Sequence, residues 1–388
     1  MKRLLIVNNN LHIGGVQKAL ISLLWEIRGR YDVTLLLFYP GGEYTDALPP
    51  DIKVISPRSG YRYLGLTKQD TVKWQDKLGR SFFAAITRLF GRKYAIALMS
   101  LGQKKLEGYD VAISYLHNGG DKAFYGGCNE FVLRHTLAEK KITFLHCDYS
   151  RCGANTAENK RQYQMFDLIA ACSQGCADAF LQENITLAKK LKVVYNCHEF
   201  KIIRKKAEAA PAVLQTDKIN IVTVARLGKE KGVERALRVI AKLGALKNKL
   251  HYYVIGDGIG MPVLRQIIQR ESLTDYVTLC GALGNPYGYM KAADLLLIPS
   301  YSEAAPLVIG ESVCLGTPIL STETSSAREM VEDPGYGWVC ENTEEAIQAA
   351  LEQLLLDRSV LDERKKTLAD IKIGNETAVS QFEKLIGC

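Results

Sequence analysis

The sequence lacks any long apolar run, and this absence excludes a chain built around membrane-spanning helices. No stretch approaches the ~20 apolar residues that such a helix needs. The chain has 388 residues, of which 47% are apolar and 24% charged, the balance of a water-soluble globular protein. Met1 to Val7 is followed by three asparagines, which predicts a first strand and not a secretory signal.

Paired cysteines and paired histidines are also missing. The ten cysteines are scattered without a C-x-x-C pair and without a secretory signal, so we expect reduced thiols in a cytoplasm. The six histidines do not have the spacing of metal ligands, and the sequence predicts no metal site. The G-x-G-x-x-G fingerprint of dinucleotide-binding proteins does not occur after the first strand, which disfavours an NAD-dependent oxidoreductase.

What the sequence does contain is a repeated alternation of apolar strands and amphipathic helices. The strands expected in the first half are residues 2–7, 32–38, 52–55, 110–115, 141–146, 168–172 and 192–195. Those expected in the second half are residues 219–225, 251–255, 276–280, 294–298, 318–321 and 337–340. This alternation and the chain length predict an α/β fold with two doubly wound domains that face each other across a cleft.

The domain boundaries follow from composition. Residues 1–200 form the expected first domain and residues 217–370 the second. Residues 201–216 are predicted to be a linker, because the stretch that begins at Lys201 is rich in Lys, Glu and Ala and shows no apolar stripe.

Two glutamates flank a break in the chain after an apolar strand. Glu303 lies in a polar loop, and Pro306 favours the start of a helix that carries Glu311. In one continuous helix the two carboxylates would point about 80° apart, whereas the break allows both to face one cavity. The helix start would offer free N–H groups to an anionic or hydroxyl-rich ligand. The alternative is a pair of ordinary solvated carboxylates.

A second candidate lies in the turn before the helix near Val233. Arg226 and Lys231 flank this turn, so both cations can reach one anion over a helix N-terminus. A guanidinium with an ammonium suits a diphosphate better than a single carboxylate. The alternative is a lysine-rich surface turn. A further junction, at Gly256 and Gly258, would let a ligand or a helix approach the backbone closely.

The first half offers polar residues at the ends of its expected strands. Gly14 and Gly15 close the first loop just before a helix whose N-terminus is available to a phosphate or a sugar. His117, His146 and Ser173 follow later strands, and the carboxyl ends of parallel strands share one edge of a sheet. Either histidine could instead be an ordinary hydrogen-bonded loop residue.

Positive charge is concentrated in one segment. Residues 58–105 carry eleven Lys and Arg against Asp70 and Asp76, hence +9, whereas the whole chain carries +8. Apolar residues recur there at helical spacing beside the basic ones: Phe82, Phe83, Ile86, Leu89 and Phe90. Two interpretations stay open, a basic amphipathic helix at an anionic membrane and a core-facing helix with a solvated basic rim.

These motifs occur in an order that resembles a known family. The set comprises Val224-Ala225-Arg226-Leu227, Glu230-Lys231-Gly232, Gly256-Asp257-Gly258, Asn285-Pro286-Tyr287, Ala293-Asp294, Ser302-Glu303 with Pro306 and Glu311, and Gly316-Thr317-Pro318. It resembles the retaining nucleotide-sugar glycosyltransferases of family 4, which build bacterial capsule, exopolysaccharide and lipopolysaccharide chains. The resemblance covers the second half almost throughout and the first half loosely. It implies a GT-B fold of two Rossmann-like domains, with residues 371–388 as a helix that crosses back to the first.

The resemblance also implies a role for each matching residue. Arg226 and Lys231 would neutralise the diphosphate leaving group, and Glu303 would bind the donor sugar. Further donor contacts would come from Gly14, Gly15, Gly256, the backbone N–H groups near Leu307 and Val308, and Glu311 at the ribose. His117 would line the reaction centre, with His146 and Ser173 on the acceptor side.

The implied activity is the retaining transfer of a hexose-type sugar from a UDP- or GDP-sugar to a hydroxyl of a growing, lipid-linked cell-surface glycan. No metal and no other cofactor is implied, and no nucleic acid partner. We expect a cytoplasmic protein, or a peripheral one at the inner face of the plasma membrane. The alternatives are a non-catalytic glycosyltransferase-like scaffold and an NAD-dependent oxidoreductase.

One residue departs from the family pattern. Ala304 stands directly after the first glutamate, where the family usually has glycine. An alanine there would be strained if the position needs a positive φ. If the glycine instead serves close approach to the sugar, the extra methyl group would narrow the choice of donor.

Overall fold

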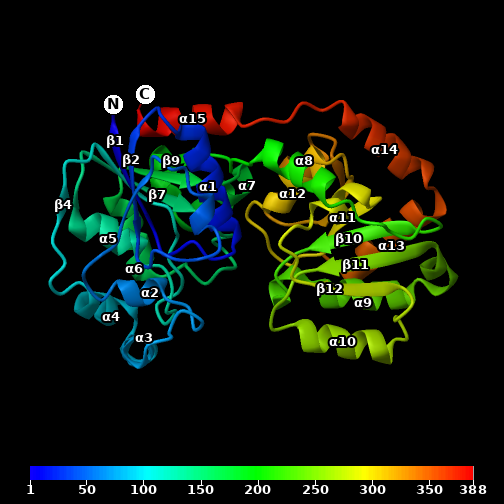
Figure 1. Cartoon of the computed structure of the whole chain (residues 1–388), viewed down its shortest axis with the longest axis horizontal. Helices are drawn as coiled ribbons and strands as arrows, with labels where there is room; N and C mark the ends of the chain where they lie inside the picture. The colour runs from blue at the N-terminus through cyan, green and yellow to red at the C-terminus, as the bar shows by residue number, and fades with distance from the viewer. Residues whose placement is uncertain (388) are drawn as a thin grey trace. The chain divides into compact units, whose positions relative to one another are not determined.

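In the computed structural model, which describes residues 1–387, the chain forms two α/β units (Figure 1). The first unit contains Met1–Cys197 together with the residues from Asn375 onward, and the second is His198–Gly374.

The strands of the first unit are β1 (Arg3–Asn8), β2 (Asp32–Leu37), β3 (Lys53–Ile55), β4 (Leu106–Glu107), β5 (Val111–Ser114), β6 (Thr136–Leu137), β7 (Lys140–Leu145), β8 (Leu168–Ala171) and β9 (Leu191–Val193). Its α-helices are α1 (Gly15–Ile27), α2 (Arg62–Gly65), α3 (Trp74–Phe90), α4 (Arg92–Met99), α5 (Cys128–His135), α6 (Ala157–Met165), α7 (Gln174–Glu183) and α15 (Glu376–Ile386). Two 3-10 turns, η1 (Thr45–Ala47) and η2 (Ile185–Lys190), complete it.

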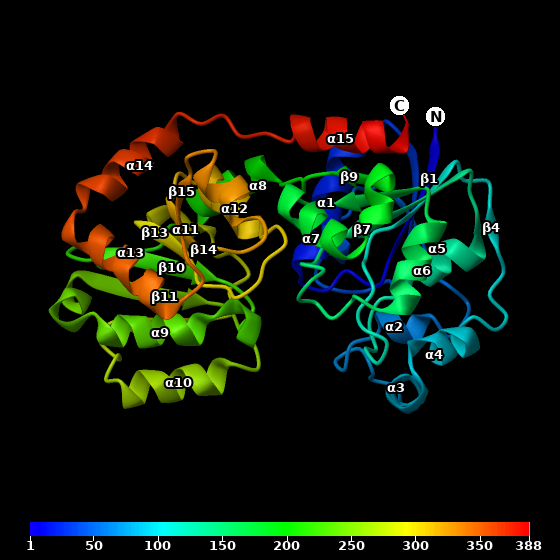
Figure 2. The same cartoon turned by 180° about the vertical axis from the view of Figure 1, so that it is seen from behind.

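The main sheet of the first unit is parallel, with the strand order β3-β2-β1-β5-β7-β8-β9. Its strands are apolar on both faces because helices cover both. Leu4 and Ile6 of β1 pack with α1 and α15, whereas Leu5 and Val7 pack toward α4 and α5. Figures 1 and 2 both show α15 beside α1, so the chain terminus completes the core of the unit in which the chain begins.

The strands of the second unit are β10 (Ile219–Val224), β11 (Leu250–Ile255), β12 (Val277–Gly281), β13 (Leu295–Ile298), β14 (Ile319–Thr322) and β15 (Gly337–Cys340). Its α-helices are α8 (Phe200–Ala209), α9 (Val233–Lys242), α10 (Met261–Arg270), α11 (Tyr287–Ala292), α12 (Leu307–Cys314), α13 (Glu344–Leu356) and α14 (Ser359–Ala369). Shorter turns are η3 (Lys229–Lys231), η4 (Gly244–Lys249) and the π-type turn η5 (Arg328–Glu332).

The sheet of the second unit is also parallel, with the order β12-β11-β10-β13-β14-β15. Ile221 of β10 packs with α9, α10 and α13 on one face. Val222, the next residue, packs with α8, α11 and α12 on the other face. The sequence therefore reads as continuous apolar runs instead of an alternating pattern.

Each sheet reverses its direction of winding at one point. In the first unit the chain winds outward from β1 through β2 and then continues on the other side with β5. In the second unit it winds outward from β10 through β11 and continues with β13. Loops at the carboxyl ends of strands that flank such a point diverge and leave a crevice, where doubly wound proteins bind ligands.

The expected strands are all present, with their ends within two residues of the expected positions. The short strands β4 and β6, which pair with each other, were not expected. No helix among the described residues is both long enough and apolar enough to pass through a bilayer.

The linker prediction for residues 201–216 was wrong over most of that stretch. Residues 200–209 are helix α8, an integral part of the second unit. Phe200, Ile203 and Ala207 form a buried helical stripe against α11 and α12. The stripe begins at Phe200, one residue before the charged stretch, so the segment from Lys201 alone shows too little of it.

Candidate functional site

The clearest polar cluster of the second unit lies at its switch point. Lys231 belongs to η3, in the connection after β10, and Glu303 belongs to the loop after β13. Since β10 and β13 are adjacent parallel strands, both connections leave the same edge of the sheet. The turn and the loop therefore meet at this edge of the sheet.

Lys231 and Glu303 are in direct contact. Lys231 Nζ donates a hydrogen bond to Glu303 Oε1 over 2.7 Å, and the side chains are 23% and 10% exposed. Ser300 Oγ donates to the same oxygen over 2.7 Å, and Ser325 Oγ donates to the Glu303 backbone carbonyl. In such a partly buried pair, the ammonium can bind an anionic group of a ligand and the carboxylate can accept hydrogen bonds from its hydroxyl groups.

The backbone fixes the distance between this turn and this loop. The Tyr301 N–H donates to the Glu230 carbonyl over 2.8 Å. Gly232 ends the turn with φ +65°, and a Cβ at this position would lie 1.9 Å from the Pro299 carbonyl oxygen. Only glycine allows this approach, so the Gly232 of the motif is required for the contact between Lys231 and Glu303.

Arg226 lies on the outer side of the same connection. Its side chain is 78% exposed, and its Nη2 forms a 2.8 Å ion pair with Glu230 Oε1. The structure therefore places the guanidinium at the surface next to the turn, and the pair with Glu230 must open before Arg226 can bind another anion.

The helix that carries Glu311 begins at Leu307, with Pro306 as its N-cap residue. No side chain caps this N-terminus. Leu307 and Val308 are half-buried in the first turn, and Glu311 is buried in the second. Among residues 1–387 the only non-glycine residue with positive φ is Ser272, which excludes backbone strain at Ala304.

Gly256 follows β11, the other neighbour of β10. It has φ +146°, and a Cβ here would lie 1.8 Å from the Ala225 carbonyl oxygen. The loops after β10 and β11 are thus joined by their backbones, and the glycine serves this contact.

Of the sequence-predicted residues of the first unit, Gly14, Gly15 and His117 lie at its switch point, and His146 and Ser173 lie farther along the same sheet edge. Gly14 is the N-cap residue of α1, after β1, and Gly15 is the first residue of that helix. His117 follows β5, the strand next to β1, while His146 and Ser173 follow β7 and β8. These residues therefore lie along one edge of the sheet.

His117 is buried and His146 is half-buried, and both are neutral at pH 7. Burial lowers the pKa of His117 to about 4, and its Nδ1 has no hydrogen-bond partner within the described structure. Burial, and then the nearby His117, lower the pKa of His146 to about 3, and its Nε2 also has no partner there. A buried polar atom without a partner is costly, so such atoms indicate a contact that a ligand or water supplies.

Ser173 has a structural task that the sequence prediction did not include. Its hydroxyl oxygen accepts a 3.0 Å hydrogen bond from the Cys176 N–H and so caps helix α7. The acceptor-side role assigned to Ser173 stays a prediction.

Sequence reasoning missed a buried amide network beneath His117. Asn118, the next residue, donates to Glu130 Oε2 and Gln162 Oε1 and accepts from the Gly127 N–H. The side-chain amide of Asn159 donates a hydrogen bond to the Gly119 carbonyl. Amides in a long loop carry no periodic signal, so this network could not be found before the fold was known.

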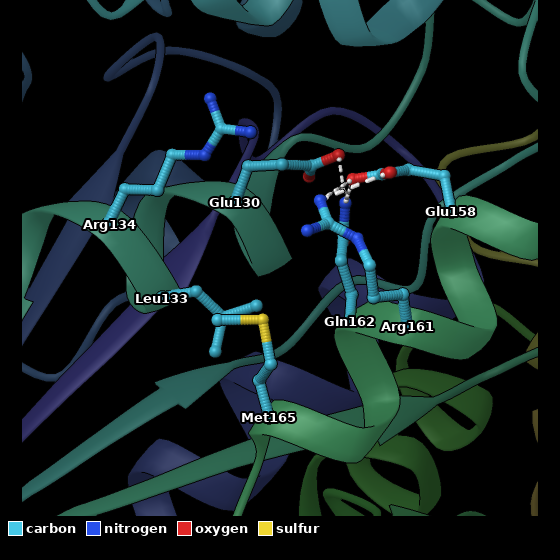
Figure 3. Close-up of a pocket in the computed structure, with 7 residues that line it drawn as sticks. All are labelled: Glu130, Leu133, Arg134, Glu158, Arg161, Gln162 and Met165. Atoms are coloured by element: carbon cyan, nitrogen blue, oxygen red, sulfur yellow. Dashed lines mark hydrogen bonds and ion pairs between the residues drawn. The ribbon is translucent and has the colours of Figure 1, made fainter.

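The same network borders a cavity of about 180 Å³ on the first unit. In Figure 3, Glu158, Arg161 and Gln162 of α6 converge on Glu130 of α5, while Arg134 points away from them. Leu133 and Met165 line the apolar side. Glu130, Glu158, Arg161 and Gln162 form hydrogen bonds with one another. We therefore assign these side chains to the support of the His117 loop and not to the binding of a ligand.

Comparison with known proteins agrees with the motif order. Residues 204–370 match the family model described as glycosyl transferases group 1. The chain is 29% identical over 212 residues to the N-acetylgalactosamine-N,N'-diacetylbacillosaminyl-diphospho-undecaprenol 4-alpha-N-acetylgalactosaminyltransferase of Campylobacter jejuni, which covers 53% of this chain and 56% of that protein. It is 31% identical over 144 residues to a putative colanic acid biosynthesis glycosyltransferase of Salmonella typhimurium, which covers 34% of this chain and 35% of that protein. The match thus spans 56% of the length of the Campylobacter relative and 35% of the length of the Salmonella relative.

The fold is similar to that of solved glycosyltransferases over the whole chain. The structure of HepE from Anabaena in complex with UDP and glucose gives a TM-score of 0.69 at 18% identity, and the similarity covers 100% of both chains. The two α/β units are therefore those of a GT-B fold, as predicted. Among residues 1–387, no three His, Cys, Asp or Glu side chains are grouped so that they could hold a metal ion.

Proposed function

We propose, on the premise that this chain belongs to the glycosyl transferases group 1 through residues 204–370, that it transfers a sugar from a nucleoside diphosphate sugar to a glycan hydroxyl. The observation that carries the proposal is the 2.7 Å pair of Lys231 and Glu303 at the switch point of the second unit. A sugar nucleotide has an anionic diphosphate next to a hydroxyl-rich ring, and this pair offers a cation for the first and a carboxylate for the second.

The proposed reaction retains the configuration of the anomeric carbon. The acceptor hydroxyl attacks that carbon from the face that the diphosphate leaves, and the bond from the carbon to the diphosphate oxygen breaks. The hydroxyl proton passes to the departing phosphate oxygen. The ammonium of Lys231 stabilises the negative charge that develops on the leaving group, aided by Arg226 once its pair with Glu230 opens.

The remaining residues bind and orient the donor and the acceptor. Glu311 would bind the ribose, and the uncapped start of α12 would add backbone N–H groups to the phosphates. His117 is neutral, so its Nδ1, which has no partner within the described structure, can form a hydrogen bond with a sugar hydroxyl without adding charge to the site. The proposal includes no metal ion, because side-chain cations and a helix N-terminus would supply the positive charge.

The donor would be a UDP- or GDP-sugar of the hexose type. The acceptor would be a lipid-linked glycan, in keeping with the diphospho-undecaprenol acceptor in the name of the Campylobacter relative. We therefore propose that the protein acts in the cytoplasm, at the inner face of the plasma membrane.

The test is to incubate the full-length protein with a panel of nucleotide sugars and follow release of the nucleoside diphosphate, then determine the anomeric configuration of the product by NMR. We expect turnover of one donor with retained configuration. Glu303→Ala should abolish transfer and leave affinity for the free nucleoside diphosphate within a few-fold. A protein that binds sugar nucleotides and never cleaves them, even slowly by hydrolysis, would be the non-catalytic scaffold.

A surface of the first unit supports the membrane part of the proposal. Helix α3 packs inward through Phe83 and Ile86, and Gly79 lies against the ring of Tyr63. A second apolar stripe of the same helix faces solvent: Trp74 (69% exposed), Leu78 (59%), Phe82 (57%) and Leu89 (72%). The inner side of α3 thus fits the interpretation as a core-facing helix, and its outer side fits the interpretation as an amphipathic helix at an anionic membrane.

Basic side chains lie beside the exposed stripe. At 100° per residue, Lys77 and Arg88 lie within about 60° of Trp74 around the helix axis, along the same flank of the stripe, and both are exposed. An apolar row with a basic flank fits an anionic bilayer, where the rings enter the headgroup region and the cations contact lipid phosphates. We therefore assign this outer face of α3 to the anionic inner leaflet.

Sedimentation of the protein with vesicles checks the assignment. Wild-type protein should sediment with phosphatidylglycerol vesicles at low salt and not with phosphatidylcholine vesicles. Each basic residue near an anionic surface contributes about 1 kcal/mol, so the double reversal Lys77→Glu and Arg88→Glu should weaken binding ~30-fold or more. Lys189→Glu, a reversal on η2 of the same unit, is the control and should change little. Dimerisation through α3 without vesicle binding would contradict the assignment.

A further inference from the structure

The second unit contains a buried guanidinium directly beneath the glutamate loop. Arg235 is the third residue of α9 and is only 1% exposed. All five of its N–H groups have acceptors: Pro299 O (2.8 Å) for Nε, Asn342 Oδ1 (2.7 Å) and Asn342 O (3.4 Å) for Nη1, and Ser300 O (2.8 Å) and Thr322 Oγ1 (3.2 Å) for Nη2. The ring of Tyr301 covers the guanidinium at 4.0 Å.

This guanidinium holds the loop that carries Glu303 at the point where the loop begins. Pro299 and Ser300 are the first residues after β13, and Arg235 binds both carbonyls. Ser300 in turn donates its hydroxyl to Glu303 Oε1. A continuous set of contacts thus leads from Arg235 through Ser300 to the carboxylate.

The charge of Arg235 is not explained by an ion pair. Within residues 1–387 no carboxylate forms a salt bridge with Arg235, although Arg238 on the next turn pairs with Glu344. A buried charge that is matched only by neutral acceptors is costly, and an apolar side chain would serve helix packing better. The planar fork of a guanidinium, however, can bind two successive carbonyls at fixed angles, which lysine cannot do.

We propose that Arg235 is a positioning residue for the donor site, which fixes the loop 299–303 so that Glu303 meets the transferring sugar in the reactive geometry. The inference rests on the proposed function. Misplacement of a substrate-binding group by even ~1 Å can cost ~100-fold in rate, so the effect belongs to turnover more than to donor binding.

The experiment uses the full-length protein and four variants. Arg235→Met removes the fork and keeps much of the volume, and Arg235→Lys keeps the charge without the fork. Thr322→Val keeps the guanidinium but removes a hydroxyl that accepts from Arg235 and donates to Ser300 O. Arg238→Met is the matched control, since it removes an arginine of the same helix that pairs with Glu344 of α13.

For each variant we would measure the melting temperature, the affinity for the free nucleoside diphosphate, and KM and kcat for the donor. We expect Arg235→Met to lower kcat at least ~30-fold with a change in nucleotide affinity below about threefold, scaled from the cost of ~1 Å misplacement. Arg235→Lys should recover little of this loss, Thr322→Val should lower kcat by a smaller factor, and Arg238→Met should leave kcat near wild type.

A folded Arg235→Met protein with wild-type kcat would overturn the inference. If Arg235→Met does not fold, Arg235→Lys and Thr322→Val decide: wild-type kcat in both overturns the inference, and a kcat loss at unchanged nucleotide affinity supports it. A wild-type protein that cleaves no nucleotide sugar is a different outcome, because it removes the proposed function and the positioning role with it.

Discussion

Protonation of His117 and His146 should destabilise the first unit at mildly acidic pH. His146 packs against the rings of Tyr115 and Phe144, with ring centroids 4.8 and 5.7 Å away. Burial, and then the charge of His117, lower its pKa to about 3, and burial lowers that of His117 to about 4, against 6.5 in an unfolded chain. The substitution His146→Phe fills the same space with a ring that cannot titrate.

The sign follows from the direction of these pKa shifts. Between pH 6.5 and the folded pKa, the unfolded histidine binds a proton and the folded one does not, so stability is complete above pH 6.5 and falls as the pH decreases. At pH 5 the chain is 1.5 units below 6.5, and each unit is worth about 1.36 kcal/mol, so each histidine removes about 2 kcal/mol. The pair removes about 4 kcal/mol, a large part of a typical domain stability.

Urea unfolding at pH 7 and pH 5 measures this loss, and tryptophan fluorescence can report on one unit. Trp25 and Trp74 belong to the first unit and Trp338 to the second, so all proteins would carry Trp338→Phe. In this background His146→Phe should reduce the loss of unfolding free energy between the two pH values by about 2 kcal/mol. His251→Phe, in the second unit, should leave it unchanged. An equal loss with and without His146 would refute the reasoning.

Three further substitutions test the cluster of the second unit. Lys231→Ala should lower turnover ~100-fold, the cost of one preorganised donor to a developing negative charge, and steady-state kinetics with the preferred donor would show it. Arg226→Ala should cause a similar loss, whereas a change well below tenfold would leave Arg226 as a surface partner of Glu230. Gly232→Ala should cost at least ~1–2 kcal/mol of unfolding free energy, because φ +65° is unfavourable for alanine, and should lower activity by moving Lys231; an unchanged melting temperature would contradict this.

Much of the fold could be predicted because both sheets are parallel and buried on both faces. Such strands read as continuous apolar runs with turn residues at their ends, so β1 and β13 were found nearly to the residue. The position of the site followed from the same property. Lys231, Glu303 and His117 each lie in the connection that follows a strand, and the rule for carboxyl ends then places them at the sheet edges.

The parts that were missed depend on contacts distant in sequence. Helix α8 reads as a linker because its buried stripe starts before the charged stretch. Arg235 lies on α9 beside an apolar stripe and reads as a solvated residue, because nothing local indicates that two carbonyls of another loop lie above it. The solvent-facing stripe of α3 has the same spacing as its core-facing neighbour, so periodicity alone cannot assign either one to the interior.

The same physical feature makes the two halves of the predicted site comparable. In each unit some of the residues that the motifs singled out lie in the loops after the two strands at which the winding reverses. Gly14 and His117 follow β1 and β5 in the first unit, and Lys231 and Glu303 follow β10 and β13 in the second. The chemistry differs: the second unit presents a cation and a carboxylate in contact, whereas the first presents neutral histidines with unpaired nitrogens. A charged pair suits a diphosphate and its sugar, and uncharged imidazoles suit hydroxyl groups. The proposed division into a donor-binding second unit and an acceptor-binding first unit rests on this difference in side chains.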